Sequence, residues 1–132
     1  KLHTWRHQLR VSCVAICAAS EQVLSGSFDK TIKLWSLGSN QCLQEFKVAS
    51  QVRNLTVDWH SMQILSWGWG TTIYHWDAKR GICIQVLEEH SDGVLCVAVN
   101  WDQKRLLSGG SDYLLVYWDL STGTRICQLQ SP

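Results

Sequence analysis

Features that would indicate a membrane protein or a nucleic-acid-binding protein are missing from this sequence. Its 132 residues include a single proline, and no apolar run approaches the roughly 20 residues of a transmembrane helix. Twelve lysines and arginines nearly balance 11 aspartates and glutamates, which gives a formal net charge of +1. So small a charge creates little overall attraction for nucleic acid or an anionic membrane surface. We therefore expect no membrane insertion, and nucleic acid is not expected to be the main partner.

Motifs for catalysis and for metal binding are missing as well. The sequence has no Gly-x-Ser-x-Gly nucleophile elbow, no phosphate-binding glycine loop and no Cys-x-x-Cys pair. Cys13 and Cys96 occupy matching positions of the repeat described below, as do Cys42 and Cys83, which is typical of small apolar packing residues. We predict no cofactor and no metal site. Free thiols indicate a reducing compartment, so an intracellular protein, cytoplasmic or nuclear, is expected.

Tryptophan, in contrast, is abundant, with eight copies. Aligning these tryptophans reveals an internal repeat. The segment Ser25–Trp35 returns as Ser66–Trp76 and again as Ser108–Trp118, with a period in the low forties. Such a period, closed by Trp-Asp in the second and third units, is typical of four-stranded β-propeller blades. The repeat therefore predicts three blades.

Short runs rich in β-branched residues predict four strands in each unit. They are expected at Val11–Cys17, Gln22–Ser27, Thr31–Leu37 and Gln41–Lys47; at Val52–Asp58, Gln63–Trp67, Thr72–Asp77 and Gly81–Leu87; and at Val94–Asn100, Arg105–Gly109, Leu114–Leu120 and Thr124–Gln130. The fold class is thus expected to be all-β, one segment over 1–132 with blades at about 8–47, 49–88 and 91–130. Residues 1–7 are expected to be the end of a preceding strand, at Lys1–Thr4, and a loop.

These units resemble the WD40 repeat family, and the resemblance covers essentially the whole chain. Trp76-Asp77 and Trp118-Asp119 match the family's motif, whereas the first unit has Trp35-Ser36. In that family a histidine before the first strand, a serine on the second, an aspartate in the tight turn and the tryptophan form a hydrogen-bonded relay. The resemblance implies this relay at His7, Ser25, Asp29 and Trp35, and at His90, Ser108, Asp112 and Trp118.

The second unit departs from that pattern. Val48 stands where the histidine is expected, and Gly70 where the aspartate is expected. Losing both polar partners together avoids leaving one of them buried and unpaired. We expect this blade to form on apolar packing and to be the least stable of the three.

The resemblance also implies a partner-binding face, on the side of the histidine loops and tight turns. The positions expected to point out of it are Arg10, Ser12 and Phe28; Gln51, Arg53 and Trp69; and Gly93, Leu95 and Ser111. Arginine and aromatic residues anchor interfaces because a large side chain gains much free energy on desolvation. Arg10 and Phe28 of the first unit and Arg53 and Trp69 of the second would together form a mixed aromatic-basic patch. Either Trp69 joins this patch, or it folds onto the tight turn of the second unit, in which the relay is incomplete.

Two tryptophans and two histidines each have two possible interpretations. Trp59 and Trp101, in hairpin turns on the opposite face, either cover the ends of the blades or form a second contact surface. His75 is expected to be a partly buried, satisfied histidine and His60 a solvated one, unless either has a function.

Three blades cannot close a ring, because propellers typically have four to eight. The apolar faces at the two ends must be covered by further blades of a longer chain, which we favour, by another copy of the chain, or by a different subunit. We predict a non-catalytic scaffold or adaptor that binds other proteins within a larger assembly. The alternatives are a nucleic-acid-binding module that uses Arg10, Arg53 and aromatic stacking, and an enzyme. The Ser/His/Asp sets resemble a hydrolase triad, but their recurrence at the repeat spacing favours an architectural role.

Overall fold

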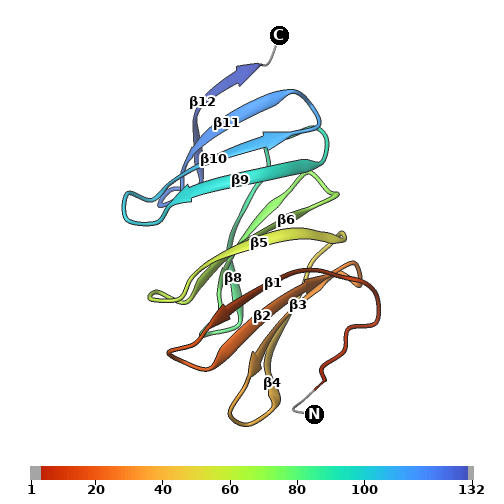
Figure 1. Ribbon diagram of the computed structural model, residues 1–132. Coiled ribbons are helices and arrows are strands. Elements are labelled where there is room, and N and C mark those ends of the chain that lie inside the picture. Colours follow the sequence, from red (N-terminus) through yellow and green to blue (C-terminus); the bar gives the residue numbers. More distant parts are fainter. Residues whose placement is uncertain (1–3, 131–132) are drawn as a thin grey trace.

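A computed structural model describes residues 4–130, which form twelve strands in three four-stranded sheets (Figure 1). The first sheet contains β1 (Val11–Cys17), β2 (Gln22–Ser27), β3 (Thr31–Ser36) and β4 (Gln41–Lys47). The second contains β5 (Val52–Asp58), β6 (Gln63–Gly68), β7 (Ile73–Asp77) and β8 (Ile82–Leu87), and the third β9 (Val94–Asn100), β10 (Arg105–Gly110), β11 (Leu114–Asp119) and β12 (Thr124–Gln130). None of the described residues forms a helix that could cross a membrane.

The strands in each sheet are antiparallel and follow one another in chain order, so hairpins connect every neighbouring pair. All twelve predicted strands are present, and none of their ends moves by more than one residue. The all-β prediction of three four-stranded antiparallel blades is confirmed. We call the sheets β1–β4, β5–β8 and β9–β12 the first, second and third blades.

The chain before β1 carries no strand among the described residues. Of the strand expected at Lys1–Thr4, residues 1–3 lie outside the described part, and Thr4 belongs to no strand. Trp5 instead stacks on Trp35, with ring centroids 5.3 Å apart and an interplanar angle of 21°. The segment thus covers part of the first blade's outer face.

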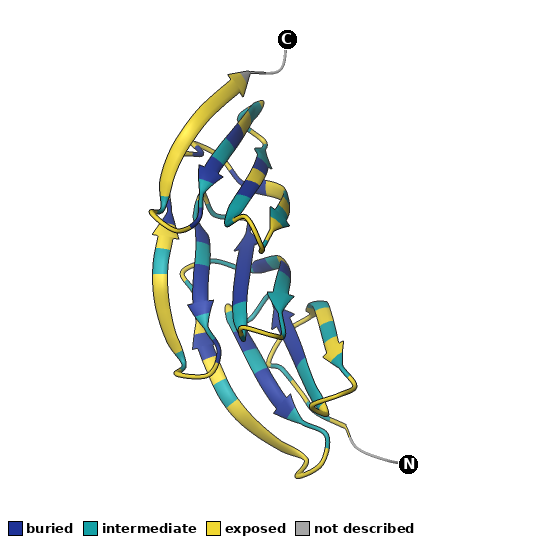
Figure 2. Ribbon diagram, turned by 90° about the vertical axis from the view of Figure 1, so that its left-hand side faces the viewer, coloured by how far each residue is buried: buried dark blue, intermediate teal, exposed yellow. Residues whose placement is uncertain are grey.

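The central strands of the first two blades, β2 and β6, are mostly buried by the neighbouring blades (Figure 2). The last strands of these blades, β4 and β8, are largely exposed. One apolar cluster joins the first blade to the second, and another joins the second to the third. A sheet covered on both faces has no solvent side that requires polar residues, and in β6 every residue after Gln63 is buried. The apolar strand β9 is largely exposed, because no further sheet packs on the third blade among the described residues.

The same repeat positions become exposed where the stack ends. Ile32 and Ile73, which face the following blade, are 0% exposed, whereas the matching Leu115 of the third blade is 41% exposed. At the other end, Val52 and Val94 are 2% and 0% exposed, whereas the matching Val11 is 47% exposed. Both end faces therefore have the composition of an interface between blades.

Polar side chains also link neighbouring blades. The Ser12 hydroxyl donates to the Val52 carbonyl oxygen at 2.6 Å, and the Gln85 amide donates to the Leu120 carbonyl oxygen at 2.6 Å. Gln85 lies against Gly123 of the third blade, whose φ of +73° and crowded surroundings both favour glycine. Each link satisfies a backbone carbonyl group at the junction between two sheets.

His75 belongs to the second of these links. Its Nε2–H donates to Gln63 Oε1 at 2.8 Å, and its Nδ1 accepts from Gln85 Nε2 at 3.1 Å, so both ring nitrogens are satisfied in the neutral form. Burial lowers the pKa of His75 most, and the nearby charge of Lys104 lowers it further, to about 4. A buried, satisfied histidine is thus the role that the contacts support.

We predict that the free energy of unfolding decreases as the pH falls from about 6.5 to about 4. The unfolded chain binds the His75 proton below about pH 6.5 and the folded chain only below about pH 4, so the unfolded state holds more protons in this window. The contribution present at neutral pH, on the order of 3 kcal/mol, is lost across it. Denaturant titrations should show a weaker pH dependence in His75→Leu, which installs the residue of the first blade at this position, Leu34. Equal pH dependence in both proteins would contradict the assignment.

Candidate protein-binding interface

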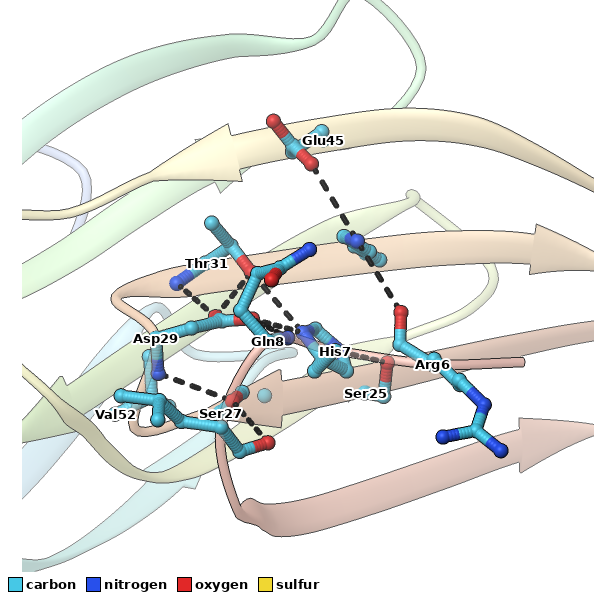
Figure 3. Close-up of polar contacts among 12 residues, drawn as sticks. Arg6, His7, Gln8, Ser25, Ser27, Asp29, Thr31, Glu45 and Val52 are labelled. Atoms are coloured by element: carbon cyan, nitrogen blue, oxygen red, sulfur yellow. Dashed lines mark hydrogen bonds and ion pairs between the residues drawn. The ribbon is translucent and has the colours of Figure 1, made fainter.

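His7, Ser25 and Asp29 of the first-blade relay lie close together in a network of polar contacts (Figure 3). His7 lies between two partners: its Nδ1 is 2.9 Å from Asp29 Oδ2, and its Nε2 is 2.6 Å from Ser25 Oγ. Trp35 Nε1–H donates to the same Ser25 oxygen at 2.9 Å. The chain of contacts connects the loop before β1, the β2–β3 turn and the centre of the sheet.

The third blade repeats this geometry closely. His90 Nδ1 is 2.9 Å from Asp112 Oδ2, and His90 Nε2 is 2.7 Å from Ser108 Oγ, to which Trp118 Nε1–H donates at 2.9 Å. In both blades the histidine and the aspartate side chains are almost fully buried. Their polar atoms are used within the blade.

The aspartates of the relay stay charged because several donors meet them. Burial by itself would raise the pKa of the Asp29 carboxyl, but hydrogen bonds from Thr31, the Gln8 backbone N–H and His7 together hold it below its usual value. The pKa of Asp112 is lowered in the same way, against the effect of its burial, by the backbone N–H groups of Ser91 and Leu114 and by His90. Each carboxylate thereby fixes a tight turn against the preceding loop.

The second blade keeps only the Ser66–Trp76 part of the relay, with Trp76 Nε1–H donating to Ser66 Oγ at 3.1 Å. A small cavity of about 10 Å³, close to the room that one water needs, is lined by Val48, Ser66 and Thr72 among others. Tyr74 stacks on Trp76 with centroids 5.6 Å apart, and its hydroxyl accepts from the Ala49 N–H at 3.3 Å. Aromatic packing takes over part of the missing polar network.

Trp69 does not fill that cavity. It is 45% exposed, and the Arg53 guanidinium lies over its ring, with Cζ 3.5 Å from the centroid. Phe28 meets it edge to face at 6.0 Å, and Arg10 Cζ lies 5.1 Å from the Phe28 centroid. The structure thus brings four predicted residues together as an alternating series across two blades, Arg10, Phe28, Trp69 and Arg53. We call it the Arg-aromatic ladder.

Two backbone features position the ladder. The Phe28 N–H donates to the Arg10 carbonyl oxygen at 2.9 Å, and the Trp69 N–H donates to the Gln51 carbonyl oxygen at 3.3 Å, so each aromatic residue lies beside the preceding loop. Arg53 occupies a β-bulge, because Val52 pairs with Gly68 and Asn54 with Trp67, which leaves it without a cross-strand partner. Bulges turn a side chain away from the regular alternation of a strand.

The other predicted positions do not join the ladder. The Ser12 hydroxyl is bonded to backbone carbonyl oxygens of the first and second blades, and Gln51 contributes its carbonyl group. Leu95 lies on the exposed face of the third blade beside a groove that includes Cys96 and Leu115. Ser111 is exposed, and its N–H donates to the Gly93 carbonyl oxygen at 2.8 Å.

The remaining candidates are placed by packing. Trp59 and Trp101 are half-buried against the two interblade clusters, which supports the reading that they cover the ends of the blades. His60 is exposed. A side chain on Gly26 would collide with Cys13, so the small cysteine fits opposite a glycine. Among the described residues no group of three or more histidine, cysteine or acidic side chains is arranged to hold a metal ion.

Sequence reasoning missed three contributors to this architecture. They are the Trp5 ring on Trp35, the Tyr74 ring on Trp76, and the pair Gln44 and Gln85, which lie against Gly81 and Gly123 of the following blades. Gln44 and Gln85 occupy the same position in their units, and Gly81 and Gly123 occupy another shared position. An alignment of the three units therefore contains this pairing. Tyr74 carries no such signal, because neither of the other units has an aromatic residue at its position. Trp5 has a counterpart in the second unit, where Phe46 meets Trp76 with ring centroids 5.2 Å apart.

Comparison with known proteins agrees with this geometry. The family "WD domain, G-beta repeat" matches residues 1–36 and 81–119, more than half of the chain. The chain belongs to the WD40 repeat family, and its three sheets are β-propeller blades. The unmatched stretch between the two ranges, residues 37–80, contains β5–β7 of the second blade, the blade in which the relay is incomplete.

Individual relatives are similar over parts of the chain. WD repeat-containing protein 18 of Bos taurus is 32% identical over 46% of this chain and 14% of its own length. Autophagy-related protein 16 of Arabidopsis thaliana is 25% identical over 72% of this chain and 20% of its own length. The solved "Structure of U3-55K" superposes with a TM-score of 0.85 at 19% identity, covering 96% of this chain and 41% of that one. This chain therefore spans a fifth or less of these two relatives and under half of that solved chain.

We expect serine-to-alanine substitutions to show how much the relay contributes to the free energy of unfolding in each of the three blades. Ser108→Ala leaves both His90 Nε2 and Trp118 Nε1 without their partner, and Ser25→Ala does the same to His7 and Trp35, so each should cost about 2–3 kcal/mol. Ser66→Ala removes the partner of Trp76 alone and should cost about 1 kcal/mol. Chemical denaturation measures the difference.

Ser39→Ala is the matched control for this series, because Ser39 is exposed in the β3–β4 hairpin, its hydroxyl forms no hydrogen bond within residues 4–130, and its loss should change stability by less than about 0.5 kcal/mol. A loss at Ser66 as large as that at Ser108 would show that the relay contributes nothing beyond the Ser–Trp bond.

Proposed function

We propose that this chain is part of a non-catalytic WD40 scaffold that binds other proteins through the face carrying the Arg-aromatic ladder. The observation that carries the proposal is the ladder itself, an exposed tryptophan held between a phenylalanine edge and a stacked guanidinium. Tryptophan and arginine are the residue types most enriched among interface hot spots. Their fixed geometry reduces the conformational entropy that binding must remove.

Burial of the Ser/His/Asp sets supports a role without catalysis. A nucleophilic serine must reach a substrate, but Ser25 and Ser108 are buried, and each oxygen already meets a histidine and a tryptophan. The two sets occupy equivalent positions in different blades. Duplicated, saturated networks of this kind fit architecture better than chemistry.

We further propose that the end faces of the array are covered by additional blades. Support comes from the repeat positions at Val11 and Leu115, which are exposed here but buried at every equivalent site between blades. The names of the relatives range from a Dictyostelium discoideum "Ribosome biogenesis protein BOP1 homolog" to an autophagy-related protein, so we propose the general role and no single process. The six unpaired cysteines support an intracellular location.

The proposal is tested by capturing partners with the whole protein and with Trp69→Ala or Arg53→Ala. Each variant should lose partners at least about 10-fold, as expected for a hot-spot residue, while the far-UV circular dichroism spectrum stays unchanged. Quantitative mass spectrometry of the cross-linked complexes gives the measurement.

Arg80→Ala is the matched control for this experiment. Arg80 is exposed in the β7–β8 hairpin, at the opposite end of the strands from the ladder. Undiminished capture by both ladder variants would remove the ladder from the function.

A further inference from the structure

Three arginines of the protein pair with acidic side chains, whereas the two arginines of the ladder, like Arg6, form no ion pair among the described residues. Arg80, Arg105 and Arg125 lie 3.7, 3.3 and 3.7 Å from carboxylate oxygens of Asp77, Asp119 and Glu89. In residues 4–130, by contrast, Arg10 and Arg53 side chains make no ion pair and no hydrogen bond, and Arg53 Nε is buried without a partner. Two positive charges on one face are therefore left uncompensated.

Stacking on the rings fixes these charges in place. A guanidinium that lies over an aromatic ring is attracted by the ring's negative face, and its N–H groups remain in its own plane, available to an acceptor. Two parallel N–H groups match the two oxygens of a carboxylate. The ladder thus presents an ordered oxyanion-binding group at each end and an apolar aromatic surface between them.

On this basis we propose that the ladder binds an acidic segment of a partner protein, with one carboxylate on Arg53, another on Arg10 and an apolar side chain between them against Phe28 and Trp69. This inference rests on the proposed function and adds the chemistry of the partner. Charge complementarity carries it, because the site holds two unpaired cations although the whole chain is close to neutral.

The ring distances limit the spacing of the acidic residues. Arg10 Cζ is 5.1 Å from the Phe28 centroid, the two rings are 6.0 Å apart, and Arg53 Cζ is 3.5 Å from the Trp69 centroid. The guanidiniums therefore lie no farther apart than about four residues of extended chain, at roughly 3.3 Å per residue. In such a chain side chains i, i+2 and i+4 share one face. Four residues is thus about the widest spacing that the limit allows, and we propose a segment that reads acidic, any, apolar, any, acidic, because it leaves one apolar side chain between the two acids on the same face.

A pair of synthetic peptides tests this inference. One is a fluorescein-labelled peptide with the core Asp-Ser-Leu-Ser-Asp, and the other has asparagine in place of both aspartates. Fluorescence anisotropy with the whole protein should show the acidic peptide binding at least about 10-fold more tightly, since charge-assisted hydrogen bonds are stronger than those between neutral groups. Arg53→Gln should remove most of this preference.

Two further variants separate charge from geometry. Arg53→Lys keeps the charge but loses the planar fork, so the acidic peptide should still bind at least about 3-fold more weakly. Arg80→Gln, which removes an arginine at the other end of the blade, should change affinity less than about 2-fold.

The possible failures are distinguishable from one another. Equal binding of both peptides, lost together in Trp69→Ala, would overturn the acidic preference and leave the proposed function intact. Binding of neither peptide at millimolar concentration would overturn the inference, and the capture experiment would then decide the proposed function separately. Tighter, steeply salt-dependent binding of a single-stranded oligouridylate would overturn it in favour of nucleic acid.

Discussion

The structure depends on the burial of each sheet by the sheets on either side of it. A four-stranded antiparallel sheet with two apolar faces cannot bury both of them alone. Here Ile32 and Ile73 reach complete burial only because another blade follows them, and Leu115, which has no following blade, is exposed. Hydrogen bonds such as that from Gln85 to the Leu120 carbonyl group then complete the junction at the exposed edge of the stack.

The polar relay is a consequence of this stacking. Once the centre of a sheet is buried, the Trp35 and Trp118 N–H groups and the histidines need partners inside the blade, and serine supplies the shared oxygen. The second blade shows how far the network can be reduced. With Val48 and Gly70 in place of the histidine and aspartate, the Ser66–Trp76 bond and aromatic packing by Tyr74 remain.

Much of the fold could be predicted from the sequence, because a repeat reports the same structure three times. The strand positions follow from the repeat, and the residues of both relays follow from the resemblance of its units to the WD40 family. The ladder was predicted as a patch, but its contacts were not. They depend on the bulge at Arg53 and on the approach of two turns from neighbouring blades, and neither leaves a periodic signal. The depressed pKa of His75 likewise depends on burial by the third blade.

The incomplete relay and the ladder occupy the same turn, and the backbone explains why. A side chain at Gly68 would collide with the Gln51 carbonyl oxygen, and one at Gly70 would crowd Ser50, so the turn lies against the preceding loop with glycine on both sides of Trp69. The Ser50 hydroxyl accepts from the Gly70 N–H at 3.1 Å and takes the place of an aspartate in holding the turn. Trp69 is then free of any packing role inside the blade, and Arg53, turned out by its bulge, can lie over it. The blade with the incomplete relay is therefore the one whose tight turn carries an exposed tryptophan under a guanidinium group.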